Sequence, residues 1–270
     1  MRLAYIALAA AALVPAAASA QTALTTTTYT ENFDSLPTGP TGSTGSALPA
    51  GFTFVENGSS ANGTYGISNA TPASSILAGN TYAFGFATTA TDRAFGSAGS
   101  DSLTSAMYGF VFTNGLGGTI DSFDLSYQGE QWFRGTSTDD GLTFQYSTDA
   151  TSLTNGTWTS VNSLFFAPPS TSGTPALTNG NLALFKKTLT GSITGLSIEQ
   201  GGTFAFRWTD VNSNGDDYGL AIDDVKIIST LKQESAVPEP ATWAMMMMGF
   251  GAMGTLLRKR PRANARVRFA

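Results

Sequence analysis

The sequence predicts an all-β protein, a two-sheet β-sandwich or jelly roll. Short runs of β-branched and aromatic residues recur along the chain, separated by clusters of Gly, Asn, Ser and Pro. Several runs alternate, so that Phe204, Phe206 and Trp208 share one face of their strand. No amphipathic helical period is present between residues 22 and 230. About ten short strands in one domain fit two packed sheets. The expected strands are residues 25–33, 51–56, 81–87, 107–113, 119–128, 142–147, 157–166, 183–190, 203–210 and 220–229.

The first twenty residues have the layout of a secretory signal peptide. Arg2 is followed by an apolar run over residues 3–14 and by the small residues Ala18-Ser19-Ala20. We therefore expect a signal helix over residues 1–20, removed by signal peptidase after Ala20. An ordinary N-terminal helix is the alternative interpretation.

The composition excludes several kinds of chemistry. The chain has no Cys and no His, so it forms no disulfide, no Ser-His-Asp triad and no His-containing zinc site. The remaining possibilities are catalysis by carboxyl groups and a non-catalytic function. With Arg2, the six basic residues from Arg258 onwards and Glu239 set aside, seven cations face 18 acids, a net charge of −11. Nucleic acid is therefore an unfavourable partner, and divalent cations are favoured.

The C-terminal region, residues 233–270, differs from the preceding domain, residues 21–232. Pro238-Glu239-Pro240 interrupts any strand, and residues 241–257 then contain no charged side chain. A helix of that length spans roughly 25 Å, enough to cross a bilayer core. The basic residues Arg258-Lys259-Arg260 follow at once, which places the end of the chain on the cytoplasmic side of the membrane.

This tail resembles the PEP-CTERM sorting signal. It has that family's motif at Pro238-Glu239-Pro240, then Trp243 at the start of an apolar helix, and then a basic cluster. The resemblance implies recognition by an exosortase, a membrane protease-transpeptidase that removes the tail. It also implies release or attachment at the surface of a cell that makes exopolysaccharide, after transient C-terminal membrane anchoring. A plain single-pass anchor is the alternative.

The stretch "DVNSNGD" suggests a metal loop. Asp210, Asn212, Asn214 and Asp216 fall at alternating positions around a Gly, as in the first half of a calcium-binding loop. Ala221 occupies the position of the final bidentate Glu, so an EF-hand is excluded. A calcium loop completed by ligands from elsewhere and an ordinary surface turn both fit the pattern.

Asp223 and Asp224 lie inside an otherwise apolar strand. Because neighbouring side chains point to opposite faces, at least one carboxylate should be largely buried, and a buried charge needs a cation or several donors. The candidate partners of the buried carboxylate are calcium, Arg207, Arg134 and backbone N–H groups.

This strand resembles the terminal "IDD" strand of MAM-like and concanavalin-type jelly rolls, in which an acidic pair lies beside the first strand. The first strand here carries Glu31 and Asp34. The resemblance implies a structural cation site, which calcium would suit, joining the two ends of the sandwich.

The stretch "GEQWFRG" allows a saccharide site. An exposed Trp132 flanked by Glu130 and Arg134 could stack on a sugar ring, and Trp158 could contribute. The alternative is a Trp in the core and a structural Glu–Arg ion pair.

Three functions are compatible with these features. The first is an exported, non-catalytic surface or matrix protein sorted by an exosortase and associated with exopolysaccharide. The second is a lectin-like carbohydrate-binding module with a structural calcium. The third is a carboxylate glycosidase using Glu130 with Asp139 or Asp140, although no E-x-D-x-x-E strand is present. We expect the first, and hence no enzymatic activity.

Overall fold

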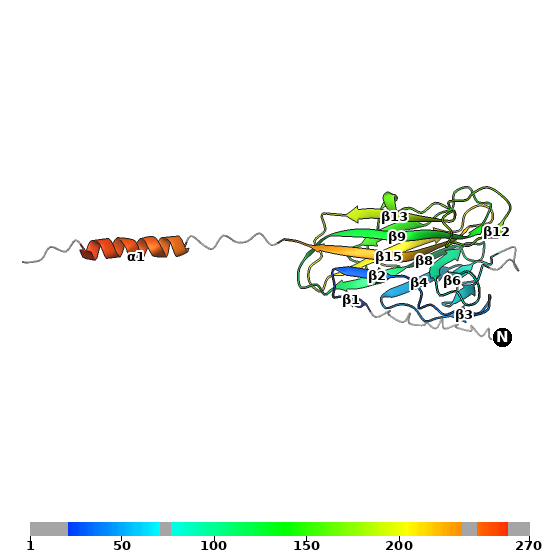
Figure 1. The fold of residues 1–270 in the computed structure, drawn as a ribbon, viewed down its shortest axis with the longest axis horizontal. Helices are drawn as coiled ribbons and strands as arrows, with labels where there is room; N and C mark the ends of the chain where they lie inside the picture. Colours follow the sequence, from blue (N-terminus) through cyan, green and yellow to red (C-terminus); the bar gives the residue numbers. More distant parts are fainter. Residues whose placement is uncertain (1–20, 71–76, 234–241, 259–270) are drawn as a thin grey trace, which may run out of the picture. The chain divides into compact units, whose positions relative to one another are not determined.

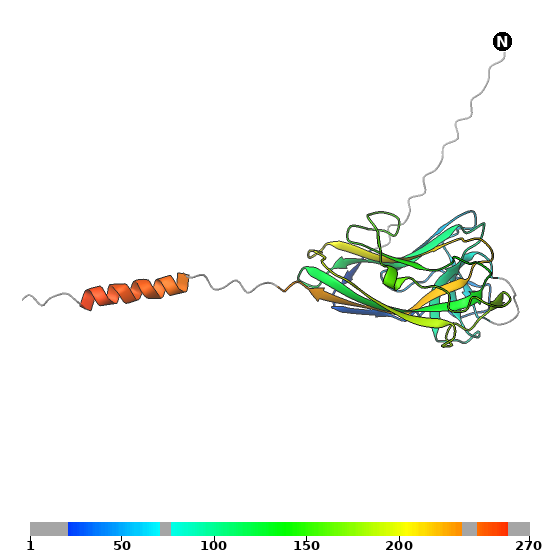
Figure 2. The same cartoon turned by 90° about the horizontal axis from the view of Figure 1, so that it is seen from above.

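A computed structural model of the chain describes residues 21–70, 77–233 and 242–258. The first two ranges form a β-sandwich whose sheets lie face to face (Figures 1 and 2). The all-β sandwich predicted from the sequence is thereby confirmed. One sheet has the order β1-β8-β14-β10-β11, with β4 also paired to β8. Its strands are β1 (Thr22–Leu24), β4 (Phe52–Asn57), β8 (Ser105–Asn114), β10 (Thr143–Ser147), β11 (Thr159–Ser160) and β14 (Thr203–Val211).

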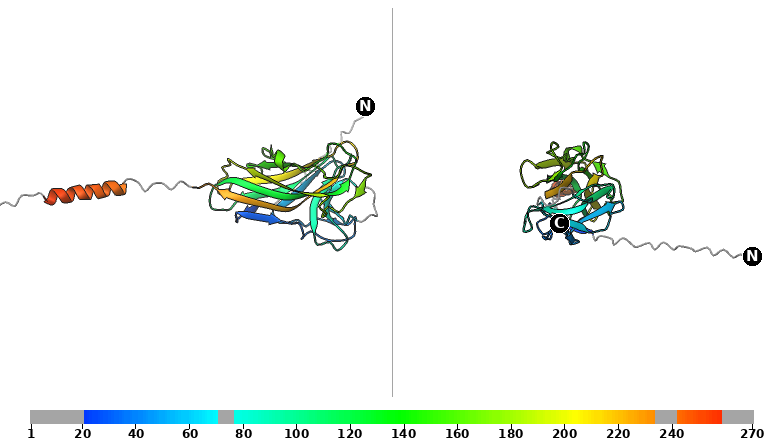
Figure 3. Two further views of the ribbon diagram at one scale, coloured as in Figure 1. Left: turned by 45° about the horizontal axis from the view of Figure 1, so that its top comes forward. Right: turned by 90° about the vertical axis from the view of Figure 1, so that its right-hand side faces the viewer.

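The second sheet has the order β12-β9-β15-β7-β6-β5-β3, with β13 paired to β9 and β2 paired to β15. β9, β15 and β2 run side by side, as Figure 3 shows in green, orange and blue. Its strands are β2 (Thr28–Glu31), β3 (Thr44–Gly45), β5 (Tyr65–Ser68), β6 (Asn80–Gly85), β7 (Arg93–Ala98), β9 (Ile120–Arg134), β12 (Ala176–Leu177), β13 (Lys186–Ile193) and β15 (Gly219–Leu231).

Aromatic side chains fill the space between the sheets. Phe204, Phe206 and Trp208 of β14 are each at most 1% exposed, as their alternation predicts. Phe123 of β9 packs against both phenylalanines from the opposite sheet, with ring centroids 4.9 and 5.0 Å apart. Rings in edge-to-face and offset contact contribute more than their buried area alone, so this layer fixes how the sheets stack.

The strand predictions are wrong in two ways: some strands were missed, and one expected strand does not form over its full length. Five of the described strands lie outside the expected ranges, and one of them, β7, lies between β6 and β15 in the sheet. These strands are β1, β3, β5, β7 and β12. Residues 157–166 were expected as one strand. They form only β11 and a short 3-10 helix, Asn162–Leu164.

The C-terminal region forms a separate compact unit, which begins at Lys232. Its helix α1 (Thr242–Arg258) is 17 residues long, and it begins and ends one residue later than predicted. None of the described helices is both long enough and apolar enough to span a bilayer.

The predicted sorting residues fall partly inside this helix. Trp243 is the second residue of α1 and Arg258 is its last. The backbone of Trp243 is thus helical, as predicted, whereas its side chain lies outside what the structure describes. The predicted signal helix, residues 1–20, also lies outside the described residues, as do Pro238, Glu239, Pro240, Lys259 and Arg260.

Candidate functional site

The first and last strands of the second sheet meet at a β-bulge. β2 pairs with β15 so that Glu31 lies opposite Val225. β15 pairs with β9 through Asp223 and again through Lys226, with a register shift between them. Asp224, at the bulge, has a φ of 47°, which is uncommon for a non-Gly residue. Bulges of this kind redirect side chains and are frequent beside functional sites.

Six acidic residues gather around this bulge, and we call them the terminal-strand cluster. Asp223 and Glu130 are the buried members, 4% and 1% exposed, whereas Asp224 is exposed. Burial raises the pKa of Asp223 to about 9, and repulsion from Glu130 adds to the shift. Burial also raises the pKa of Glu130 to about 7, against the opposing effects of Trp132 and Lys186. At least one of the two buried carboxyl groups therefore holds a proton at neutral pH when no cation is bound. The cluster consists of Glu31, Asp34, Asp92, Glu130, Asp223 and Asp224.

Most carboxylates of the terminal-strand cluster accept local hydrogen bonds. Glu31 accepts from the Phe33 backbone N–H at 2.7 Å, and Asp223 accepts from the Asp224 N–H at 2.7 Å. The side chain of Asp34 accepts from the Arg93 N–H at 3.2 Å. Burial raises the pKa of Glu31 in spite of its backbone hydrogen bonds. Glu31 and Asp224 both line a cleft of about 450 Å³.

A second set of carboxylates lies inside one end of the sandwich, and we call it the interior cluster: Asp140, Asp210 and Asp217. Asp210, from the end of β14, is 1% exposed, Asp217 is 5% exposed and Asp140 is 7% exposed. Burial, and then repulsion from Asp140, raises the pKa of Asp210 well above its usual value. Burial likewise raises the pKa of Asp140 and of Asp217.

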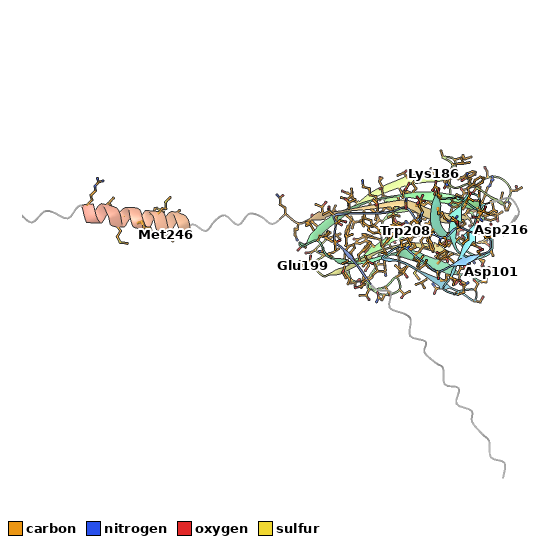
Figure 4. The ribbon with its side chains drawn as sticks, turned by 60° about the horizontal axis from the view of Figure 1, so that its bottom comes forward. Asp101, Lys186, Glu199, Trp208, Asp216 and Met246 are labelled. Carbon is orange, nitrogen blue, oxygen red and sulfur yellow. The ribbon has the colours of Figure 1, made fainter. Side chains whose placement is uncertain are left out.

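The residues of the alternating ligand pattern predicted for 210–216 differ in their burial, so the calcium loop stays a prediction beside the alternative of an ordinary surface turn. Asn214 and Asp216 are exposed and Asn212 is half-buried. Figure 4 shows Asp216 at the surface, at the end of the sandwich opposite Glu199. β14 ends at Val211, so strand alternation does not continue into the loop, and Asp217 is the loop acid that turns inward.

No group of three or more Asp or Glu side chains forms a ready-made metal centre within residues 21–70, 77–233 and 242–258. The structure nevertheless brings the first and last strands together around several acids, and it buries part of the predicted loop. No sequence pattern indicated Asp92, Asp140 or Asp217 as members of these clusters, because their neighbours come from distant segments.

Trp132 lies in the core, as the alternative interpretation of this stretch expected, and not at a saccharide site. Its side chain is fully buried and stacks on Phe84, with ring centroids 5.7 Å apart and planes 8° apart. A Cβ at Gly180 would lie 2.5 Å from the indole, so the segment at Gly180 covers the ring. Trp132 Nε1 donates to Glu130 Oε2 at 3.0 Å. Trp132 therefore cannot act as a sugar-stacking platform.

The other polar residues of the predicted saccharide site have structural partners. The Arg207 guanidinium lies 3.9 Å from the centroid of the half-buried Trp158 ring, so it occupies one ring face. Arg134 donates to the Ser172 carbonyl oxygen at 2.9 Å rather than to Glu130. No hydrogen bond joins Arg134 or Arg207 to Asp223 within the described part of the chain, so the arginine alternatives for that carboxylate are not realised.

Glu130 and Asp140 belong to different clusters and Asp139 is exposed, so the structure gives no support for a glycosidase pair. The pKa of Glu130 responds to Asp92, Lys186 and Asp224, whereas that of Asp140 responds to Asp217 and Asp139. Both side chains are buried.

Comparison with known proteins identifies the tail. Residues 236–260, a range that includes Trp243, match the PEP-CTERM protein-sorting motif, which implies export, recognition by an exosortase and C-terminal processing. The motif covers only this region of the chain. No curated protein sequence matches the chain.

Solved structures show remote likeness to the sandwich. The K3 cleaved adhesin domain of Lys-gingipain from Porphyromonas gingivalis is 13% identical, with 74% of this chain and 98% of that chain covered and a TM-score of 0.37. A CBM4 structure is 17% identical over 67% of this chain and 96% of its own, with a TM-score of 0.30. TmCBM61, in complex with β-1,4-galactotriose, is 14% identical over 52% and 72%, with a TM-score of 0.28. Likeness at this level identifies neither a ligand nor an activity for this chain.

Proposed function

We propose that this protein is an exported, non-catalytic β-sandwich that an exosortase delivers to the cell surface or the extracellular matrix. Signal peptidase removes residues 1–20, and the C-terminal tail holds the chain transiently in the inner membrane. The exosortase then recognises Pro238-Glu239-Pro240 and removes the tail. The sandwich is left outside the cell, in association with exopolysaccharide.

The match of residues 236–260 to the sorting motif carries this proposal. The order of the segments supports it, because the 17-residue helix ends at Arg258 and further basic residues follow it in the sequence. Basic residues after an apolar segment favour the cytoplasmic side, which leaves the sandwich on the other side of the inner membrane.

The chemistry of the sandwich supports a non-catalytic role. The chain has no His or Cys to act as base or nucleophile. Glu130, whose pKa is raised to about 7, is 1% exposed and hydrogen-bonded to a buried indole. A substrate would have to displace the segment at Gly180 to reach this site. The burial of Trp132 also removes the observation on which the lectin-like alternative depended.

A structural calcium ion at the terminal-strand cluster is part of this proposal. Glu31 of β2 and Asp224 of β15 line one cleft beside the buried Asp223. Calcium prefers carboxylate and carbonyl oxygens. An ion there would tie the first strand of the sheet to the last one.

Processing of the tail can be tested with the full chain carrying a C-terminal epitope tag. Expressed in a Gram-negative host with and without an exosortase, the chain should lose the tag only when the enzyme is present. The triple variant Pro238→Ala/Glu239→Ala/Pro240→Ala should retain it, whereas the control Glu199→Ala, on the surface of the sandwich, should be processed normally. Retention of the tag by the unaltered chain in an exosortase-producing host would refute the proposal.

A further inference from the structure

The carboxyl groups of the interior cluster share one arrangement: each is held by protein donors through a single oxygen. Ser97 Oγ donates to Asp210 Oδ2 at 2.6 Å. The Tyr218 N–H donates to Asp140 Oδ2 at 2.7 Å. Ser213 donates to Asp217 Oδ1 from its backbone N–H at 3.0 Å and from its hydroxyl at 2.9 Å. The three carboxyl groups are therefore oriented by their surroundings.

The second oxygen of each carboxyl group is buried and has no partner. Asp140 Oδ1, Asp210 Oδ1 and Asp217 Oδ2 are all shielded from water and accept no hydrogen bond within the described residues. Leaving a single polar atom in this state costs about 1–3 kcal/mol, and more if the group is charged. Three such oxygens from three neighbouring side chains indicate that a ligand supplies the missing interactions.

The phenol of Tyr108 is an independent observation at the same place. Tyr108 is fully buried on β8, and its hydroxyl has no hydrogen-bond partner among the described residues. Burial, Asp210 and Asp140 raise the pKa of the phenol, whereas the hydroxyl of Ser97, which also donates to Asp210, lowers it. This fourth unpartnered oxygen therefore faces the interior cluster.

We propose that Asp140, Asp210 and Asp217 bind a calcium ion inside this end of the sandwich, separate from the ion proposed at the terminal-strand cluster. The ligands are the three free carboxyl oxygens. The donors from Ser97, Tyr218 and Ser213 hold the opposite oxygens, as outer partners commonly do in metal sites. Because the free oxygens do not form a ready-made centre among the described residues, binding must draw them together. The ion replaces their mutual repulsion by attraction to a shared charge.

The type of ligand and the access route both favour calcium. All the candidate ligands are oxygens, and the chain has no His or Cys for softer metals. Calcium accepts six to eight oxygen ligands in flexible geometry, whereas magnesium demands near-ideal octahedral geometry and keeps several waters. A cleft of about 220 Å³ borders Asp217 and Gly99 and offers an entry path. Its neighbours Asp101 and Asp216 lie at this end of the sandwich (Figure 4).

The site also explains why a residue with no side chain occurs at position 99. A Cβ there would lie 1.9 Å from Asp217 Oδ2. Any larger residue would therefore displace this free oxygen. Gly99→Ala should consequently weaken calcium binding while it leaves all three carboxylates in the chain.

The inference is tested by counting the calcium ions bound at saturation to the purified, chelator-treated full chain. Equilibrium dialysis against radioactive calcium gives the number for the unaltered chain and for Asp210→Asn. The isosteric variant should bind one ion fewer. The matched control is Asp101→Asn, an exposed acid near the same cleft, which should bind as many ions as the unaltered chain.

Two further variants keep the test decisive. Ser97→Ala, which removes only the donor to Asp210, should weaken one class of calcium sites by about 10- to 100-fold. Asp223→Asn separates this inference from the function proposed above, because it should remove only the terminal-strand ion. If Asp210→Asn binds as many ions as the unaltered chain, the interior site does not exist, and sorting by the C-terminal motif is unaffected. A melting curve in chelator checks folding, since Asp210→Asn should be at least as stable as the calcium-free unaltered chain.

Discussion

The terminal-strand cluster and the interior cluster both contain buried carboxyl groups. They differ in whether those groups have a buried oxygen without a hydrogen-bond partner. In the terminal-strand cluster, neither Glu130 nor Asp223 has an oxygen that is both fully buried and unpartnered among the described residues. Glu130 accepts from an indole and lies opposite Lys186 of β13. In the interior cluster each carboxyl group has one such oxygen.

This difference shows that burial alone does not identify a ligand site. A buried carboxyl group can remain without a ligand by keeping a proton, and the raised pKa values of Asp223 and Glu130 permit this. A proton shared between two acids satisfies two oxygens. A single proton cannot satisfy three carboxyl groups at once, so the interior cluster needs either several protons or a multivalent ligand such as the calcium ion proposed above.

The largest expected effect is a loss of stability with rising pH in the calcium-free protein. The folded pKa of Asp223, about 9, exceeds the unfolded value of about 3.9. Its contribution is fully present below the unfolded pKa and is lost as the pH rises through the folded one. The loss is at most about 5 kcal/mol between pH 4 and pH 8. Urea unfolding in chelator should show this trend, and Asp223→Asn should flatten it. An unfolding free energy that rises over this range would contradict it.

The groups that face Asp223 set the size of this effect. Glu130, Asp224 and Asp92 each raise its pKa by repulsion, in that order, after burial itself. The Asp224 backbone N–H opposes them. A Glu130→Gln variant should therefore show a weaker pH dependence than the unaltered chain.

Calcium removal should have the next largest effect. An ion that binds only the folded state, at a free concentration a hundredfold above its dissociation constant, stabilises the protein by about 2.7 kcal/mol. For a domain of this size that corresponds to a melting temperature about 5–11 °C higher. Calorimetry with and without chelator at pH 7.5 measures the shift. Asp210→Asn should lose part of it, and an identical shift in this variant would count against the interior site.

The hydrogen bond from Trp132 offers a smaller and pH-dependent test of the terminal-strand cluster. Trp132→Phe keeps an aromatic ring against Phe84 but removes the donor to Glu130. At pH 8 the ionised Glu130 then lacks its buried partner, at a cost of about 2 kcal/mol. At pH 5 the protonated carboxyl group should make the cost smaller. Equal losses at both pH values would show that the cost comes from packing alone.

The smallest expected effect concerns the exposed loop residues. Asn214→Ala and Asp216→Ala alter side chains that face water, so each should change the unfolding free energy by less than about 0.5 kcal/mol. The number of calcium ions bound should also stay the same. A lost ion in either variant would favour the alternating ligand pattern.

The sequence analysis correctly predicted the features that depend on the alternation of side chains along a strand. The core face of Phe204, Phe206 and Trp208 followed from side-chain periodicity, and so did the burial of one member of the Asp223–Asp224 pair. The periodicity ends with β14 at Val211. In the loop, backbone turns decide which side chain points inward, which is why Asp217 was missed in favour of Asp216. The segment that buries Trp132 contains Gly180, 48 positions away in the chain. No local sequence pattern predicts such a contact.

The most direct test of the interior site is a crystal structure of the protein grown in calcium, with the ion located by its anomalous scattering. We predict an anomalous peak within about 2.3–2.6 Å of Asp140 Oδ1, Asp210 Oδ1 and Asp217 Oδ2. If these carboxyl groups are instead found hydrogen-bonded to one another with no ion between them, then protons rather than calcium stabilise this end of the sandwich.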